Sequence, residues 1–170
     1  MDRHILFLTD GNIDILNVMK VAVARHRILE EKVGVTFLQG VYLPDSTIDL
    51  MFYSKRKVLE QIYDRDFRSA CEMIRSKYSS DLSSIRKELF SIPRQIEFNR
   101  YLDQEGIDEV YYQPGVEFVK RHDRSFDLRP YANKCNRPVS AIDWDSESVT
   151  DTTLFDPLVK LFFNHESFDF

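Results

Sequence analysis

The first 44 residues follow a strand–helix–strand pattern, which limits the fold more than any other feature of this chain. The continuous apolar run Ile5–Leu8 predicts a strand buried on both faces. Apolar residues then recur at helical spacing from Ile15 to Ile28, after a possible cap at Asn12 or Asp14. A second strand, Val35–Tyr42, follows and ends at Leu43-Pro44. This pattern predicts two parallel strands joined by a right-handed crossover.

The remainder of the chain continues the alternation of helices and strands. The pattern predicts a long helix from Ile48 to Tyr78, a short strand at Lys87–Ile92 that also fits a helix, a helix from Pro93 through Leu102, a strand at Asp108–Gln113, a helix from Asp123 or Ser125 towards Cys135, and a strand at Val139–Trp144. We therefore expect an α/β fold, a doubly wound three-layer sandwich whose mainly parallel five-stranded sheet carries helices on both faces.

Two regions of different character divide the chain. Residues 1–144 form the predicted α/β domain, and residues 145–170 form a C-terminal extension. That extension begins with a polar, acidic stretch and becomes apolar and aromatic from Leu154 onward. Because an exposed apolar segment promotes association, we expect the extension to pack either on its own domain or on a partner subunit.

Composition excludes several classes of protein. With a net charge of −5, the chain lacks the basic balance of a general nucleic-acid binder. It contains neither a signal peptide nor an apolar stretch of about 20 residues, so we expect a cytoplasmic protein without membrane contact. Cys71 and Cys135 do not form a paired motif and are expected to be buried reduced thiols. The four histidines have no metal-ligand spacing, and His26, between two arginines, is expected on the surface.

The first strand places a carboxylate, Asp10, where open α/β sheets bind ligands. In such sheets the ligand lies beyond the carboxyl ends of the strands, at the point where the strand order reverses. A simpler explanation is that Asp10 only caps or orders the loop. The sequence Asp10-Gly11-Asn12 contains one glycine, too few for a phosphate-binding loop next to this strand.

The layout resembles the universal stress protein family, within the adenine-nucleotide alpha-hydrolase-like fold, over about Arg3 to Trp144. Three features carry the resemblance: a first strand ending in Thr9-Asp10, a second ending near Val41, and a Pro-Val-led last strand at Asn136–Ile142. The resemblance implies that Asp10 and Val41 would flank an adenine or ribose if a nucleotide bound. It also implies a homodimer, because domains of this family are often dimers.

Nucleotide-binding members of that family carry the motif Gly-x2-Gly-x9-Gly-Ser/Thr after the fourth strand. Here the second glycine corresponds to Gly115, whereas Tyr112 replaces the first glycine, Ser125 the third and Phe126 the hydroxyl residue. Glycine matters because it lets backbone N–H groups approach a phosphate closely. The substitutions therefore predict a degenerate site in which ATP binding has been lost, and Ser125 is expected to cap a helix instead.

A basic cluster lies in the same loop and supplies an alternative. Its members are Lys120, Arg121, His122, Arg124 and Arg129. These side chains would neutralise a phosphate or another anion beside Asp10. The simpler explanation is a solvated charged loop, in which Asp123 and Asp127 pair with the cations.

The sequence as a whole favours a non-catalytic domain that acts in stress response or signalling through dimerisation or a protein partner, the C-terminal segment being one possible contact. We expect no cofactor and no enzymatic activity. The alternative is a sensor of a nucleotide or anion, with ATP or AMP held by Asp10, Val41, Gly115, Arg121, Arg124 and Ser125. An alpha-hydrolase-like enzyme is the third and least supported class.

Overall fold

A computed structural model describes residues 2–143. In that part of the chain the elements are β1 (Asp2–Leu8), α1 (Ile15–Ile28), β2 (Lys32–Val41), α2 (Thr47–Met51), α3 (Lys55–Ile62), α4 (Arg65–Lys77), β3 (Leu82–Phe90), α5 (Gln95–Gln104), β4 (Glu109–Tyr112), β5 (Ser125–Phe126), α6 (Arg129–Ala132) and β6 (Val139–Ala141). Five strands form a parallel sheet in the order β3-β2-β1-β4-β6, and β5 pairs antiparallel with β2. The predicted α/β fold is confirmed, with the two-residue β5 as a sixth strand.

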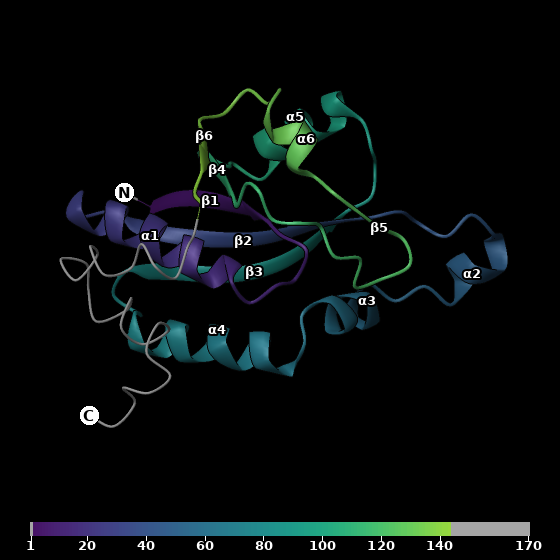
Figure 1. Cartoon of the computed structure of the whole chain (residues 1–170), viewed down its shortest axis with the longest axis horizontal. Helices are drawn as coiled ribbons and strands as arrows, with labels where there is room; N and C mark the ends of the chain where they lie inside the picture. The colour runs from purple at the N-terminus through teal and green to yellow at the C-terminus, as the bar shows by residue number, and fades with distance from the viewer. Residues whose placement is uncertain (1, 144–170) are drawn as a thin grey trace.

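The order of the strands places helices on both faces of the sheet. The chain passes from β1 to β2 and β3 in one direction, and it then returns to β4 and β6 on the other side of β1. Right-handed crossovers therefore put α1, α3 and α4 on one face and α5 and α6 on the opposite face. Figure 1 shows α5 and α6 above the sheet and α3 and α4 below it.

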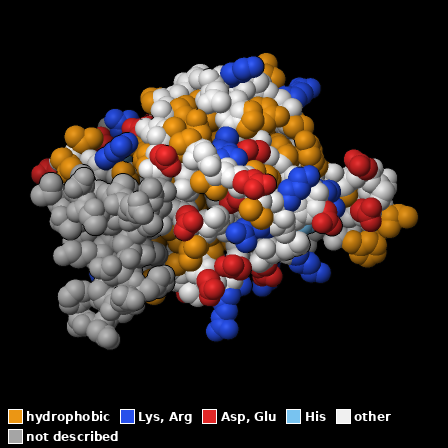
Figure 2. All heavy atoms as spheres, viewed as in Figure 1, with side chains coloured by type: hydrophobic (Ala, Val, Ile, Leu, Met, Phe, Trp, Pro, Cys, Tyr) orange, Lys and Arg blue, Asp and Glu red, His pale blue; other side chains and the backbone are white. Residues whose placement is uncertain are grey.

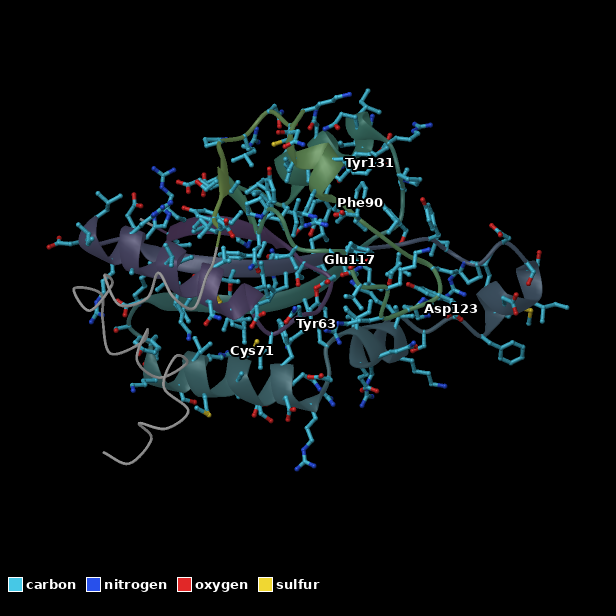
Figure 3. The ribbon with its side chains drawn as sticks, viewed as in Figure 1. Tyr63, Cys71, Phe90, Glu117, Asp123 and Tyr131 are labelled. Carbon is cyan, nitrogen blue, oxygen red and sulfur yellow. The ribbon has the colours of Figure 1, made fainter. Side chains whose placement is uncertain are left out.

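Each face of the sheet has its own hydrophobic core, because successive side chains of β1 point in opposite directions. Ile5 and Phe7 pack with α1, α3 and α4, whereas Leu6 and Leu8 pack under α5 and α6. Figure 3 shows Tyr63 and Cys71 in the first core and Phe90 and Tyr131 on the opposite side. Burying one such large side chain fully contributes about 1.5–3 kcal/mol, so these two cores fix the arrangement of the layers.

The predicted long helix from Ile48 to Tyr78 is wrong: the structure divides it into α2, α3 and α4. Two N-cap side chains explain the breaks. The Ser54 hydroxyl accepts a hydrogen bond from the Lys57 N–H at the start of α3, and the Asp64 carboxylate accepts one from the Phe67 N–H at the start of α4. Each cap residue has extended backbone angles, so the chain turns at that residue and a new helix begins.

The short helix α2 has no buried residue and forms an arm outside the core. Ile48, Met51 and Phe52 are 69%, 76% and 79% exposed. Figure 1 shows α2 projecting at the right, away from the layers, and Figure 2 shows hydrophobic side chains gathered at that end. We use "the α2 arm" for residues 43–52. Exposed apolar side chains gathered in one place mark a candidate interaction surface.

Other predicted elements are confirmed or corrected by their local contacts. The uncertain strand at Lys87–Ile92 exists as β3 and begins earlier, at Leu82, and the helix after Pro93 is α5. The helix predicted from Asp123 or Ser125 is wrong, because Ser125 and Phe126 form β5 and the only helical turn in that stretch is α6. Pairing with β2 satisfies the backbone of that segment in place of a helix.

The expectation for His26 is wrong, whereas the two cysteines are free thiols as expected. His26 is buried, not exposed: its Nδ1 lies 2.7 Å from the Glu31 carboxylate, and its Nε2 lies 3.6 Å from the Glu109 carboxylate. Both cysteines are free thiols, Cys71 buried and Cys135 partly buried. Burial raises the pKa of Cys71 to about 11, so this thiol stays protonated near neutral pH.

In the described part of the chain, no helix has the length and apolar character needed to cross a bilayer. The predicted C-terminal extension at residues 145–170 lies outside the described residues, so its packing and the domain boundary stay predictions.

Candidate functional site

The strand order reverses between β1 and β4, and Asp10 lies at this switch point immediately after β1. Its carboxylate is already engaged by the chain itself. One oxygen accepts a hydrogen bond from the Asn12 N–H at 2.9 Å, and the other accepts one from the Val119 N–H at 3.0 Å. Asp10 therefore both orders its own turn and holds the loop that follows β4. These contacts agree with the simpler explanation given for Asp10, in which its carboxylate orders the loop.

Arg129 holds the same loop from its other side. Its Nε and one terminal nitrogen pair with the Asp127 carboxylate, with distances of 2.8–3.1 Å. Its other terminal nitrogen donates to the carbonyl oxygens of Gln113 and Val116, at 3.2 Å and 2.6 Å. The hydrogen bonds that Arg129 donates to the Asp127 carboxylate raise the pKa of Arg129 above its ordinary value. The predicted pairing of Asp127 with the basic cluster is thus present, and it fixes the loop instead of leaving a cation open to a ligand.

The space that remains at the switch point is small. A pocket lies between Leu8–Asn12, the loop at Gln113–Phe118 and the segment Asp127–Arg129, and its cavity volume is about 40 Å³. This volume is room for a few water molecules, and it is far below the roughly 300–1,000 Å³ of pockets that hold drug-sized ligands. We call it the switch-point pocket. Figure 3 labels Glu117, one of its lining residues, between the labels of Phe90 and Tyr63.

The segment Arg124–Phe126 covers the end of β2, where the second strand was expected to contact a nucleotide. Ser125 pairs with Val41 and Phe126 with Gly40. The Tyr42 N–H donates to the Arg124 carbonyl at 2.9 Å, and the Arg124 Nε donates back to the Tyr42 carbonyl at 3.0 Å. The Phe126 ring stacks on Tyr42, with centroids 4.3 Å apart. Val41 and Ser125 therefore bind each other.

Gly40 makes this close contact possible. A Cβ atom added there would lie 2.5 Å from the Phe126 carbonyl oxygen and 2.8 Å from the Phe126 ring, closer than real Cβ contacts allow. A glycine inside a strand pattern is a known sign of close approach by another segment. Gly40 is thus a signal in the sequence of the close contact between β2 and β5.

A second pocket lies beyond β5, on the side of the α2 arm. Its volume is about 240 Å³, and it is lined by Pro44, Asp49, Phe52, Tyr53, Ser54, Lys57, Val58, Gln61, His122 and Arg124. We call it the arm pocket. It shares no lining residue with the switch-point pocket. The segment Arg124–Phe126 therefore separates two pockets at the carboxyl ends of the strands.

The residues predicted for one nucleotide site consequently fall in different places. Asp10 lines the switch-point pocket and Arg124 the arm pocket, whereas Val41 and Ser125 lie in the β5–β2 pairing. Gly115 occupies a turn with φ of +72° and lines neither pocket.

Arg121, the sixth predicted residue, packs against Gly11. A Cβ added at Gly11, whose φ is +90°, would lie 2.8 Å from Arg121 Cδ. The Arg121 carbonyl accepts a hydrogen bond from the Gln61 side chain at 2.9 Å, which ties the loop to α3. This residue therefore contributes to packing between the loop and the first turn.

Several buried polar atoms near β5 have no hydrogen-bond partner among residues 2–143. They are the Gln39 side-chain oxygen, the Tyr63 hydroxyl, the Ser125 hydroxyl and the Arg121 Nε. Burial raises the pKa of Tyr63 well above its ordinary value, so its hydroxyl keeps its proton. Leaving one such group unsatisfied costs about 1–3 kcal/mol. This end of β2 is therefore less well satisfied than an ordinary core.

The described residues contain no group of three or more histidine, cysteine or acidic side chains arranged to hold a metal ion.

Comparison with known proteins places the fold. No protein-family model and no curated protein sequence matches the chain. A universal stress protein family structure from Burkholderia pseudomallei is 10% identical over 83% of this chain and 96% of its own, with a TM-score of 0.50. A universal stress protein from Lactobacillus plantarum is 13% identical over 82% and 97%, also with a TM-score of 0.50.

A third solved structure is a universal stress protein in complex with cAMP. It is 11% identical over 84% of this chain and 98% of its own, with a TM-score of 0.53. Together these likenesses show that the chain has the universal stress protein fold, which confirms the resemblance drawn from the sequence at the level of the fold.

Proposed function

We propose that this chain is a non-catalytic domain that acts by binding a protein chain, and that the partner is a second copy of itself. The observation that carries the proposal is the closed cleft at the switch point. Asp10 is engaged by two backbone N–H groups, β5 covers the end of β2, and the cavity left is about 40 Å³. Its setting, on the resemblance to universal stress proteins, is stress response or signalling.

The α2 arm supports association as the mode of action. Its exposed apolar side chains project from the body of the domain, where a second molecule can reach them. A twofold-symmetric contact buries the same patch on both subunits, so each apolar side chain of the arm would be buried twice in a homodimer. Each fully buried apolar side chain would contribute about 1.5–3 kcal/mol to such a contact.

Light scattering on the full chain tests the homodimer. We expect the wild type to be a dimer and the Ile48→Ser/Phe52→Ser variant to be a monomer at the same concentration. A matched control is Ile28→Ser/Leu29→Ser, because these residues are 73% and 65% exposed but form the C-terminal end of α1, and Figure 1 shows α1 on the side of the molecule away from α2. A monomeric wild type, or equal dissociation of both variants, contradicts the proposal. A chain ending at Asp145 tests the C-terminal segment separately.

A nucleotide sensor is the second candidate, and two observations favour it. Asp10 lies at the switch point, and one protein with a similar fold was solved in complex with cAMP. Binding would require the loop at Gln113–Arg124 to leave Asp10, which costs the hydrogen bond to Val119. We propose that this rearrangement does not occur at cellular nucleotide concentrations.

Calorimetric titration with ATP, AMP and cAMP separates the two candidates. We expect no heat of binding for the wild type up to millimolar nucleotide. Micromolar binding that is lost in Asp10→Ala would replace the homodimer proposal with the sensor. The Asp14→Ala variant is a suitable control, since Asp14 lies in the same turn and does not line the switch-point pocket.

A further inference from the structure

We propose that the arm pocket binds a small phosphate monoester that carries an apolar group. This goes beyond the proposed association, with which it shares the side chain of Phe52. The pocket lies between the α2 arm, α3 and the turn at His122–Arg124. Figure 3 shows Asp123, the middle residue of that turn, near α3 on the side of the molecule towards α2.

The size of the pocket limits the ligand. Its volume of about 240 Å³ is below the roughly 300–1,000 Å³ of pockets that hold drug-sized molecules. A volume of this size suits a phosphate with one small ring better than a full dinucleotide. The switch-point pocket shares none of the lining residues, so a ligand here leaves Asp10 and Val119 in contact.

Two cations in the lining are not neutralised by the protein. Among residues 2–143, neither Lys57 nor Arg124 lies in an ion pair, although neighbouring cations do: Lys55 pairs with Glu88 and Arg56 with Glu60. Arg124 uses its Nε on the Tyr42 carbonyl, which holds the guanidinium in place and leaves its terminal nitrogens for an anion. The chain carries a net charge of −5, so two unneutralised cations in one pocket are a local excess of positive charge.

His122 adds a directed hydrogen-bond donor. Its Nδ1 accepts the Arg124 N–H at 3.1 Å, so in the neutral ring the proton must lie on Nε2. Burial, together with the nearby Arg124, lowers the pKa of His122 and favours that neutral form. His122 lines the same pocket as Lys57 and Arg124, and an Nε2–H donor there matches the acceptor oxygens of a phosphate. Asp49 is the single carboxylate in the lining, so the cations outnumber it.

The other residues that line the arm pocket explain why we expect the ligand to carry an apolar group. Pro44, Phe52 and Tyr53 add apolar and aromatic surface to the polar side chains that line the pocket. Phe52 is 79% exposed, and a ring placed against it would remove that surface from water. The combination of an aromatic wall and a few polar groups is the common composition of small-molecule sites.

Calorimetric titration of the full chain with phenyl phosphate, inorganic phosphate and phenol tests the site. We expect phenyl phosphate to bind more tightly than inorganic phosphate, and phenol not to bind at the same concentrations. In Lys57→Gln the affinity for phenyl phosphate should fall about tenfold or more, as expected for the loss of one charge-assisted hydrogen bond. Arg56→Gln is the matched control, because Arg56 is on the same helix but outside the pocket, and its affinity should be unchanged.

Two further variants keep the test decisive. Arg124→Lys retains the charge but cannot reproduce the fork of the guanidinium, and it should also weaken phenyl phosphate. Asp14→Ala should leave the affinity unchanged, since Asp14 lines neither pocket. Equal effects of Lys57→Gln and Arg56→Gln, binding of phenol, inorganic phosphate binding as tightly as phenyl phosphate, or loss of binding in Asp14→Ala would each overturn the proposal. Phe52 takes part in both proposals, but Lys57 and Arg124 take part in this one alone, so their variants separate failure here from failure of the homodimer.

Discussion

At the scale of single residues, the closed cleft depends on Gly40. Phe126 lies directly against the Cα of Gly40, and the β5–β2 pairing has only two residue pairs. So short a strand does not hold itself in place by backbone hydrogen bonds alone. The stacking of Phe126 on Tyr42 and the exchange of hydrogen bonds between Arg124 and Tyr42 complete it.

We expect Gly40→Ala to displace β5 from the end of β2. The new Cβ would meet backbone as well as ring atoms of Phe126, and overpacking of this kind costs about 1–3 kcal/mol. Chemical denaturation should show that loss, and trypsin should cleave faster after Lys120, Arg121 or Arg124. Gly34→Ala in the same strand is the control: its nearest neighbour is the movable Ser84 hydroxyl at 3.1 Å. Equal effects of the two substitutions would contradict the expectation.

At the scale of elements, the caps of α3 and α4 decide where the helices begin. Asp64 lies between α3 and α4 in the sequence, and its carboxylate satisfies the Phe67 N–H at 2.9 Å. Phe67 then faces the core, where its ring meets Phe37 edge-on at 5.3 Å. The cap thus sets the rotation of α4 as well as its first residue.

We expect Asp64→Ala to lower the free energy of unfolding by about 1 kcal/mol, the usual cost of losing an N-cap side chain. For a protein of this length the melting temperature should fall by about 2–4 °C. Asp66→Ala removes an acid from the same first turn without removing a capping bond, so a smaller loss of about 0.3–1 kcal/mol is expected. A loss in Asp66→Ala as large as that in Asp64→Ala would show that charge, not the cap, carries the effect.

The elements that the sequence predicted well are those whose own residues determine them. The apolar run at Ile5–Leu8 and the spacing from Ile15 to Ile28 gave β1 and α1, because burial and helical period are local signals. The break at Ser54 was missed because charged and apolar residues continue on both sides, and a serine cap is visible only when its partner N–H is known. β5 was missed because its backbone partner lies 84 residues away, at Val41.

The same distinction between local signals and contacts of distant residues applies to the candidate site. Asp10 was correctly expected at the switch point, since the end of a first parallel strand has a fixed place in such a sheet. Its hydrogen bond to Val119 joins residues 109 apart in sequence, so no local pattern predicts it. The arm pocket was missed as well, because Lys57 and Arg124 belong to segments that only the fold brings together.

At the scale of the whole molecule, stability should depend on pH through Lys20. This lysine is 1% exposed, and burial lowers its pKa from 10.5 to about 6. Between these values the unfolded chain binds a proton at Lys20 that the folded chain does not. Raising the pH through this window therefore stabilises the fold, and lowering it towards 6 removes that stability.

We expect the free energy of unfolding to rise with pH between 6.5 and 8.5 more steeply in the wild type than in Lys20→Met. One proton contributes at most about 1.4 kcal/mol per pH unit. Other groups that titrate in this range are the same in both proteins, so the difference between the two denaturation profiles isolates Lys20. Parallel profiles would mean that Lys20 keeps its charge in the folded protein.

The position of β5 also has a consequence for the protein as it is synthesised. Val41 leaves the ribosome 84 residues before Ser125, the residue that will cover it. At about 5–20 residues per second, that interval lasts roughly 4–17 s. During it β1 and β2 can pair while the end of β2 is still uncovered. The nascent chain therefore passes through a period in which the end of β2 has no β5 to cover it, and this period ends once Phe126 has left the ribosome.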